Sequence, residues 1–201
     1  MILVICALMP ELKYVTRRDG VEIAAGGVGP VEAAIATASA LARRNYDAVV
    51  NAGIAGAFRE RARIGEALLV TGESLADLGL EGGGELALPG GATLVERAAA
   101  DPELVLRCST LGLRQGTGVT VASVTTTDAT AARLSQRYGA DLESMEGFSV
   151  LRAAAVARVP ALEVRGVSNY VGWRARADWY FVAGARAAAA ALDAVLERLV
   201  A

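Results

Sequence analysis

Short apolar segments alternate with helix-forming segments along the chain, and this alternation constrains the fold more than any other feature. Buried strands are predicted at residues 2–7, 21–25, 47–51, 66–73, 119–125 and 161–167. Helices are predicted at 30–44, 93–106 (broken near 101–102), 128–138 and 145–157, with a short one within 9–18 and a long final one from about 178. A glycine-rich loop is expected at 79–91. Such alternation is typical of an α/β fold with a mostly parallel sheet covered on both faces.

Composition excludes several kinds of chemistry. The chain has no His, so Ser-His-Asp triads, imidazole bases and His-ligated metal sites are not available to it. Cys6 and Cys108 lack metal-site spacing and are expected to be buried thiols in a reducing compartment. A net charge of −2 gives no basic surplus for nucleic acid. The apolar runs are too short to span a membrane, and no secretory signal is expected. We therefore expect a cytoplasmic protein that binds neither nucleic acid nor membrane.

Two glycine segments follow predicted strands. Gly27-Val28-Gly29 precedes a helix, but Glu32 occupies the third glycine position of a dinucleotide-binding pattern and would repel a pyrophosphate. This segment is either a turn whose amides approach a small ligand or a purely structural turn. The segment at 53–56 would also let a ligand approach the backbone, although a simple bend after the strand is the alternative.

Polar groups gather at the end of the strand at 161–167. Ser168 and Asn169 follow it directly, and Asn is depleted in strands and scarce in this chain. Because ligands bind at the carboxyl ends of strands in open α/β sheets, this pair indicates a site. Taken singly, Glu11, Glu143 and Glu146 could each be an ordinary carboxylate at a helix start.

The loop that follows this pair is rich in arginine and tryptophan. Arg174, Arg176 and Trp179 could close over an anionic substrate that carries a ring. A surface loop that packs its tryptophans is an equally good interpretation.

Taken together, the segments at 7–11, 51–56, 144–147 and 165–169 resemble the purine nucleoside phosphorylase and nucleosidase superfamily, in matching order. The variants at 143–147 and 168–172 are most similar to the futalosine hydrolases, nucleosidases of a menaquinone route. The resemblance implies a single domain over 1–201, a three-layer sandwich with a mostly parallel, partly mixed twisted sheet. It also implies a homo-oligomer, a dimer or a multiple of dimers, without metal or organic cofactor.

The resemblance assigns roles to individual residues. Glu146 would grip the ribose 2′- and 3′-hydroxyls and stabilise the cationic sugar, and Met145 would pack against the ribose. Glu11 would orient and deprotonate the attacking water, for which a carboxylate within hydrogen-bond reach suffices. Further substrate contacts are implied at Gly53, Ile54, Val124, Thr125, Phe148 and Ser168.

The 5′ end of futalosine, as the resemblance implies, carries a carboxyphenyl ketone. Arg174 or Arg176 could pair with its carboxylate, while Phe148, Tyr170 or Trp179 could cover its ring.

At three positions this sequence differs from related enzymes, and two of the differences favour a particular base and a particular reaction. Asn169 replaces the Asp of nucleosidases that cleave adenine nucleosides, which favours hypoxanthine, because an amide can donate to N7 or to a 6-oxo group but cannot deliver a proton. Asn51 replaces a phosphate-binding Arg of the phosphorylases, and Glu11 would repel phosphate, so hydrolysis is favoured. Ile54 replaces a Ser of the adenine nucleosidases. The alternatives are a methylthioadenosine or adenosylhomocysteine nucleosidase, a purine nucleoside phosphorylase, or a nucleoside-binding protein without turnover.

Overall fold

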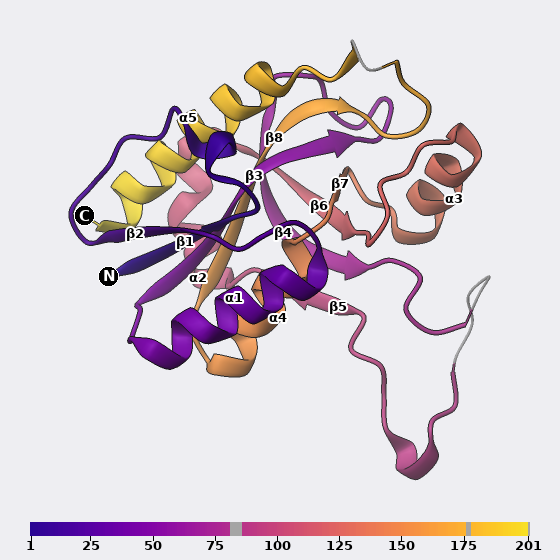
Figure 1. Ribbon diagram of the computed structural model, residues 1–201, viewed down its shortest axis with the longest axis horizontal. Coiled ribbons are helices and arrows are strands. Elements are labelled where there is room, and N and C mark those ends of the chain that lie inside the picture. The colour runs from indigo at the N-terminus through magenta and orange to yellow at the C-terminus, as the bar shows by residue number, and fades with distance from the viewer. Residues whose placement is uncertain (81–85, 176–177, 201) are drawn as a thin grey trace.

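The computed structural model describes residues 1–80, 86–175 and 178–200, and its centre is one sheet (Figure 1). The strands run in the order β2-β1-β3-β7-β6-β4-β5, and β8 pairs with β3 and β4. Their bounds are β1 Ile2–Cys6, β2 Val21–Ala25, β3 Ala48–Ala57, β4 Ala67–Leu75, β5 Arg97–Ala99, β6 Arg114–Thr120, β7 Leu142–Ser144 and β8 Ala161–Tyr170.

The sheet is mixed, with more parallel than antiparallel pairings. β1 runs parallel to β2 and β3, β3 to β8, and β6 to β4 and β7. The antiparallel pairs are β3 with β7, β4 with β5, and β4 with β8. Because β7 pairs with both β3 and β6, the strands β3, β8, β4, β6 and β7 are joined in a closed ring. The predicted α/β fold with a mostly parallel, partly mixed sheet is confirmed.

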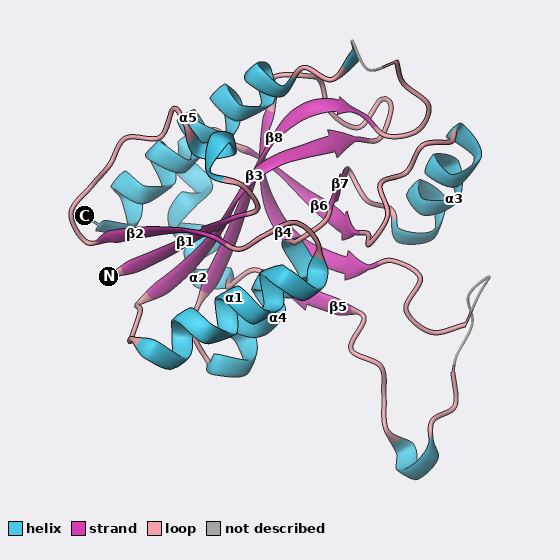
Figure 2. Ribbon diagram, in the orientation of Figure 1, coloured by secondary structure: helices cyan, strands magenta, loops and turns pink. Residues whose placement is uncertain are grey.

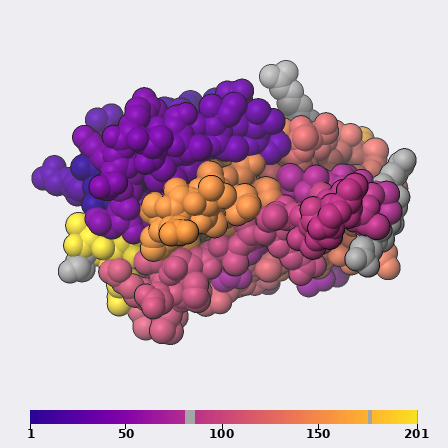
Figure 3. Space-filling model, turned by 90° about the horizontal axis from the view of Figure 1, so that it is seen from below, coloured from indigo at the N-terminus to yellow at the C-terminus, as the bar shows by residue number. Residues whose placement is uncertain are grey.

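Helices cover both faces of this sheet (Figure 2). The helices are α1 Pro30–Arg43, α2 Pro102–Cys108, α3 Asp128–Tyr138, α4 Gly147–Ala157 and α5 Phe181–Val200, with the short 3-10 helices η1 Met9–Leu12, η2 Pro89–Gly91 and η3 Ser109–Leu111. α1 packs beside α4 on one face, purple next to orange in Figure 3, and α5 packs on β8 with α2 against it. No helix of the described residues is long and apolar enough to cross a membrane.

Alternation along β1 explains the three layers. Ile2, Val4 and Cys6 belong to one core cluster with the buried side of α5. Leu3 and Ile5 belong to another cluster with α1 and α4. Since successive side chains of a strand point to opposite faces, a strand that is apolar throughout must be covered twice. Each large aliphatic side chain buried in this way contributes about 1.5–3 kcal/mol.

Two predicted elements were wrong. The strand predicted at 119–125 lies at 114–120, so only its first two residues were placed correctly. The helix predicted at 93–106 is the strand β5 followed by α2. Asp101 ends the extended segment because its side chain accepts from the Leu104 amide at 3.0 Å, and Pro102 then opens the helix.

Several boundaries also differ from the predictions. β3 continues through 53–56, where a bend was the alternative, and β8 extends past Ser168 and Asn169. β7 was not predicted, the helix predicted from residue 145 begins at Gly147, and the final helix begins at Phe181. Residues 81–85 of the predicted glycine-rich loop lie outside the described residues.

Candidate active site

A cavity of about 240 Å³ lies at the carboxyl ends of β1, β3 and β8. Residues from all four sequence motifs border it: Glu11, Ile54, Met145, Glu146, Ser168 and Asn169. Val124, Arg174 and Trp179, also expected as substrate contacts, border it as well. Segments separated by more than a hundred residues therefore supply one pocket, as the placement of polar groups at strand ends predicts.

Glu11 is held over β3 by two backbone amides. The 3-10 helix η1 places it directly after β1, with 5% of its surface exposed. Its carboxylate accepts from the Leu8 amide at 3.2 Å and from the Ile54 amide at 2.9 Å. A Cβ at Gly53 would collide with Oε2 of Glu11, so glycine there makes this approach possible. Burial raises the pKa of Glu11, and the Ile54 amide and the charge of Arg165 oppose that shift.

Glu146 lies at the N-cap of α4 and is also buried. Its Oε1 accepts from the Gly29 amide at 3.1 Å, and its Oε2 lies 3.5 Å from Nη1 of Arg165. Gly29 has a φ of 96°, a conformation that favours glycine. In the turn before α1, the Gly29 amide therefore donates to a carboxylate of the protein itself. This contact accounts for the glycine without a bound dinucleotide.

Arg165 is the cation that allows these acids to be buried together. It is 1% exposed, and its Nε donates to Glu163 at 2.7 Å while its Nη1 donates to the Ile54 carbonyl at 3.3 Å. Burial alone would lower the pKa of Arg165, but the charges of Glu163, Glu146 and Glu11 outweigh it and raise that pKa. Buried acids need such a partner because desolvation of an unpaired charge is costly.

No role was predicted for Arg165, although it opens the motif at 165–169. The signal that could have found it is the spacing of Glu163 and Arg165 two residues apart in an otherwise apolar strand. Side chains at that spacing point to the same face. A buried acid and base on one face of a central strand indicate an ion pair.

Asn169 has a fixed amide orientation. Its Oδ1 accepts from the Ser168 hydroxyl at 2.8 Å, and its Nδ2 donates to the Tyr170 carbonyl at 3.0 Å. Gly56 makes room for the amide, since a Cβ there would lie 2.9 Å from Nδ2. An amide nitrogen carries two hydrogens, so one donor is left for a ligand in the cavity.

Some expected contacts lie elsewhere. Gly53, Thr125 and Phe148 do not border the cavity. Gly53 is covered by Glu11, Thr125 is buried, and Phe148 is buried, its amide bonded to the Thr120 hydroxyl. Arg176 lies outside the described residues.

The aromatic and basic contacts come from the loop before α5. Arg174 donates through Nη1 to the Thr125 carbonyl at 3.3 Å and to the Gly172 carbonyl at 3.4 Å. Trp179 is half-exposed and meets Phe181 edge to face, with ring centroids 5.8 Å apart. Phe181 also borders the cavity. This contact was not predicted, because Phe181 opens a helix of ordinary apolar pattern.

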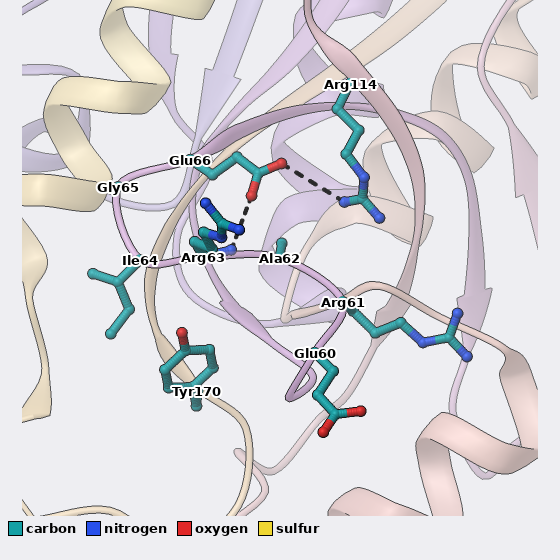
Figure 4. A pocket seen from close by; sticks show the side chains of 9 residues that line it. All are labelled: Glu60, Arg61, Ala62, Arg63, Ile64, Gly65, Glu66, Arg114 and Tyr170. Atoms are coloured by element: carbon teal, nitrogen blue, oxygen red, sulfur yellow. Dashed lines mark hydrogen bonds and ion pairs between the residues drawn. The ribbon is translucent and has the colours of Figure 1, made fainter.

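A wider hollow of about 920 Å³ surrounds the loop between β3 and β4 and includes Tyr170 (Figure 4). There Glu66 accepts from the Arg63 amide at 2.9 Å and lies 3.9 Å from Arg114. Glu66 is thus engaged by groups near the surface, whereas Glu11 and Glu146 are buried and border the smaller cavity. We therefore take the smaller cavity as the candidate active site.

Metal and thiol chemistry receive no support from the described residues. Among them, no group of three or more His, Cys, Asp or Glu side chains is arranged to hold a metal ion. Cys6 and Cys108 are free and buried, as predicted. Burial raises the pKa of Cys6 to about 12, so its thiol is neutral.

Known proteins are similar to this chain in sequence and in fold. The phosphorylase superfamily matches residues 11–201. Futalosine hydrolase of Streptomyces coelicolor is 43% identical over 185 residues, 88% of this chain and 77% of that protein. Futalosine hydrolase of Thermus thermophilus is 38% identical over 159 residues, 76% of this chain and 71% of that protein.

Solved structures show the same fold at low sequence identity. Futalosine hydrolase of Helicobacter pylori strain 26695 has a TM-score of 0.85 at 16% identity and covers 98% of this chain, which covers 97% of it. The 5′-methylthioadenosine/S-adenosylhomocysteine nucleosidase of Neisseria meningitidis, in complex with methylthio-immucillin-A, has a TM-score of 0.82 at 20% identity, with 98% of each chain covered.

The chain belongs to the phosphorylase superfamily, whose model spans nearly all of it. Within that superfamily, identities of 38% and 43% over most of the chain identify it as a member of the futalosine hydrolase family.

Proposed function

We propose that this protein hydrolyses the N-glycosidic bond of futalosine and releases hypoxanthine and dehypoxanthine futalosine, a step of menaquinone biosynthesis. The choice of futalosine as substrate is supported by the similar futalosine hydrolases of Streptomyces coelicolor and Thermus thermophilus. The observation that carries the proposal is the meeting of Glu11, Glu146 and Asn169 around one cavity. Two buried carboxylates and an oriented amide are the groups that a nucleosidase without histidine needs.

The sugar and the water are assigned to the two acids. Glu146 binds the ribose 2′- and 3′-hydroxyls, and its charge stabilises the oxocarbenium-like sugar that forms as the bond to the base breaks. Glu11 accepts a proton from a water molecule, whose oxygen then bonds to C1′. Met145 packs against the ribose. Arg165 is a positioning residue, since its guanidinium forms an ion pair with the Glu146 carboxylate.

The leaving purine is assigned to Asn169. Negative charge accumulates on the base as the bond to C1′ breaks, and the free hydrogen of the Asn169 amide is directed at N7 or O6. Ser168 holds the amide in that orientation. Since the amide keeps its proton, the departing base takes one from a second water molecule, and the hydroxide that remains takes back the proton that Glu11 accepted.

The remote end of the substrate is assigned to the loop before α5. Arg174 pairs with the carboxylate, and Trp179 and Phe181 cover the ring; Phe148, buried away from the cavity, is not part of this proposal. Arg174 already donates to two backbone carbonyls, but a guanidinium has five N–H donors. Arg174→Gln should slow turnover of futalosine much more than that of inosine.

Two other reactions are disfavoured by specific contacts. Phosphorolysis needs a cation for phosphate where Asn51 stands, and Asn51 is fully buried with its amide donating to Glu163 at 3.1 Å. Cleavage of methylthioadenosine needs an acid at position 169. Incubation with futalosine, inosine and methylthioadenosine, with and without phosphate, tests these choices. Release of hypoxanthine from futalosine without phosphate is expected, and absence of base release from all three would reject the proposal in favour of a binding protein.

We also propose that the protein acts as a cytoplasmic homo-oligomer. Val28, Val31 and Ile35 are exposed at the start of α1 and along it. Val28 also borders the cavity, so a second copy seated there would cover both the apolar residues and the cavity mouth. Light scattering should give a mass at least twice that of one chain, and Val31→Glu should lower it.

A further inference from the structure

A third buried glutamate, Glu143, borders the cavity and has no part in the reaction described above. It lies on β7, 6% exposed. Its Oε1 accepts from the Thr125 amide at 3.1 Å. Its Oε2 is buried without a hydrogen-bond partner among the described residues. A buried acceptor with no donor is costly in the empty protein, so a ligand that supplies a donor would remove that cost.

The backbone beside Glu143 is already engaged. The amide of Thr125 is taken by Glu143, and its carbonyl accepts from Arg174 at 3.3 Å. The backbone of Thr125 is therefore not free to bind the edge of a purine, and side chains must recognise it. Glu143 and Asn169 both border the cavity. Oε2 of Glu143 has no partner among the described residues, and Nδ2 of Asn169 donates only one of its two hydrogens there.

The two families of purine differ in what their edges offer. A 6-oxopurine carries a hydrogen on N1 and an acceptor at O6. A 6-aminopurine carries an acceptor at N1 and donors at the 6-amino group. An ionised carboxylate is an acceptor only, and the spare N–H of Asn169 is a donor.

We propose that Glu143 determines specificity by accepting the N1 hydrogen of a 6-oxopurine, while Asn169 donates to the N7 or O6 edge. This inference rests on the proposed function and names the part of the same site that reads the base. A 6-aminopurine would bring its N1 lone pair against the Glu143 carboxylate. Sites that leave a buried polar group unpaired reject the wrong substrate by factors of about 10⁴ or more.

The test is Glu143→Gln, assayed on futalosine and on its 6-amino analogue, which differ only at the purine edge. The glutamine can still accept from the Thr125 amide through its oxygen, but it then presents an N–H₂ to N1. The ratio of kcat/KM for futalosine to that for the 6-amino analogue should fall at least about 100-fold. Glu66→Gln is the matched control, because Glu66 also accepts from a backbone amide but lies outside this cavity, and it should leave the ratio unchanged.

The outcomes distinguish a role of Glu143 in base specificity from a purely structural role. An unchanged ratio in Glu143→Gln, with or without loss of rate, would mean that Glu143 only holds Thr125, and would overturn the inference while hydrolysis of futalosine stands. No turnover of either substrate by the unaltered protein would reject the proposed function and the inference together. Should Glu143→Gln fail to fold, product inhibition of the unaltered protein decides: hypoxanthine should inhibit at least about 100-fold better than adenine, and equal inhibition would overturn the inference.

Discussion

Gly53→Ala should abolish most activity although it replaces no side chain that is proposed to act in catalysis. The added Cβ would collide with Oε2 of Glu11 and lie 2.9 Å from Nη1 of Arg165. Gly53 has no left-handed φ, so alanine fits the backbone and the only conflict is with these side chains. Glu11 must then leave the Ile54 amide, which now holds it at 2.9 Å.

The size of the effect follows from the role proposed for Glu11. A positioned general base contributes about 10²–10⁴-fold to the rate, which corresponds to about 3–5 kcal/mol of the barrier. kcat for futalosine hydrolysis should fall by that factor, with a much smaller change in KM. The assay is release of hypoxanthine, compared with Gly72→Ala, whose Cβ would meet only an ordinary contact at 3.7 Å from the Ala98 carbonyl.

A double variant makes the reasoning refutable. If Gly53→Ala acts by displacing Glu11, it should add little to Glu11→Gln, because the base is already lost. Near-normal kcat in Gly53→Ala, or losses that multiply in the double variant, would show that the glycine serves another purpose.

Four further predictions concern the charged and polar groups of the cavity. Glu146→Gln should reduce kcat for futalosine at least about 100-fold with little change in folding, and near-normal turnover would remove its assignment to the sugar. Asn169→Asp should raise kcat/KM for adenine nucleosides relative to 6-oxopurine nucleosides by at least about 10-fold, measured by base release; an unchanged ratio would contradict its role at the purine. Burial raises the pKa of Glu11 above its ordinary 4.5, and a base must be ionised, so kcat/KM should fall as the pH falls through that raised value. The same shift means that the folded state binds the proton more tightly than the unfolded chain, so stability falls as the pH rises through this range. Glu11→Gln should therefore raise Tm at neutral pH, and a lower Tm would refute the linkage.

The sequence could predict where the site lies because the sheet is largely parallel. Ser168 and Asn169 follow an apolar strand directly, and the carboxyl ends of parallel strands meet at one edge. Glu11 and Glu146 joined them only through the resemblance, since a single carboxylate at a helix start has an ordinary explanation.

Other parts of the fold and site depend on contacts between distant segments, which local sequence patterns do not predict. β5 and β7 have three residues each, too few to show a period, and both exist because a longer strand lies beside them. The contact of Glu143 with the Thr125 amide joins residues eighteen apart. Phe148 follows the Glu146 motif directly, yet its place inside the helix turns it away from the cavity.

The Arg165 guanidinium forms ion pairs with two carboxylates, those of Glu146, which borders the cavity, and of Glu163, which does not. Glu163 is fully buried and does not border the substrate space, yet it holds the guanidinium whose charge acts on both Glu11 and Glu146. The pKa of Glu11, which the charge of Arg165 lowers, therefore depends in part on a residue that does not border the cavity. A change in the pH dependence of this enzyme is therefore best sought at position 163, where a substitution leaves Glu11 and Glu146 themselves unaltered.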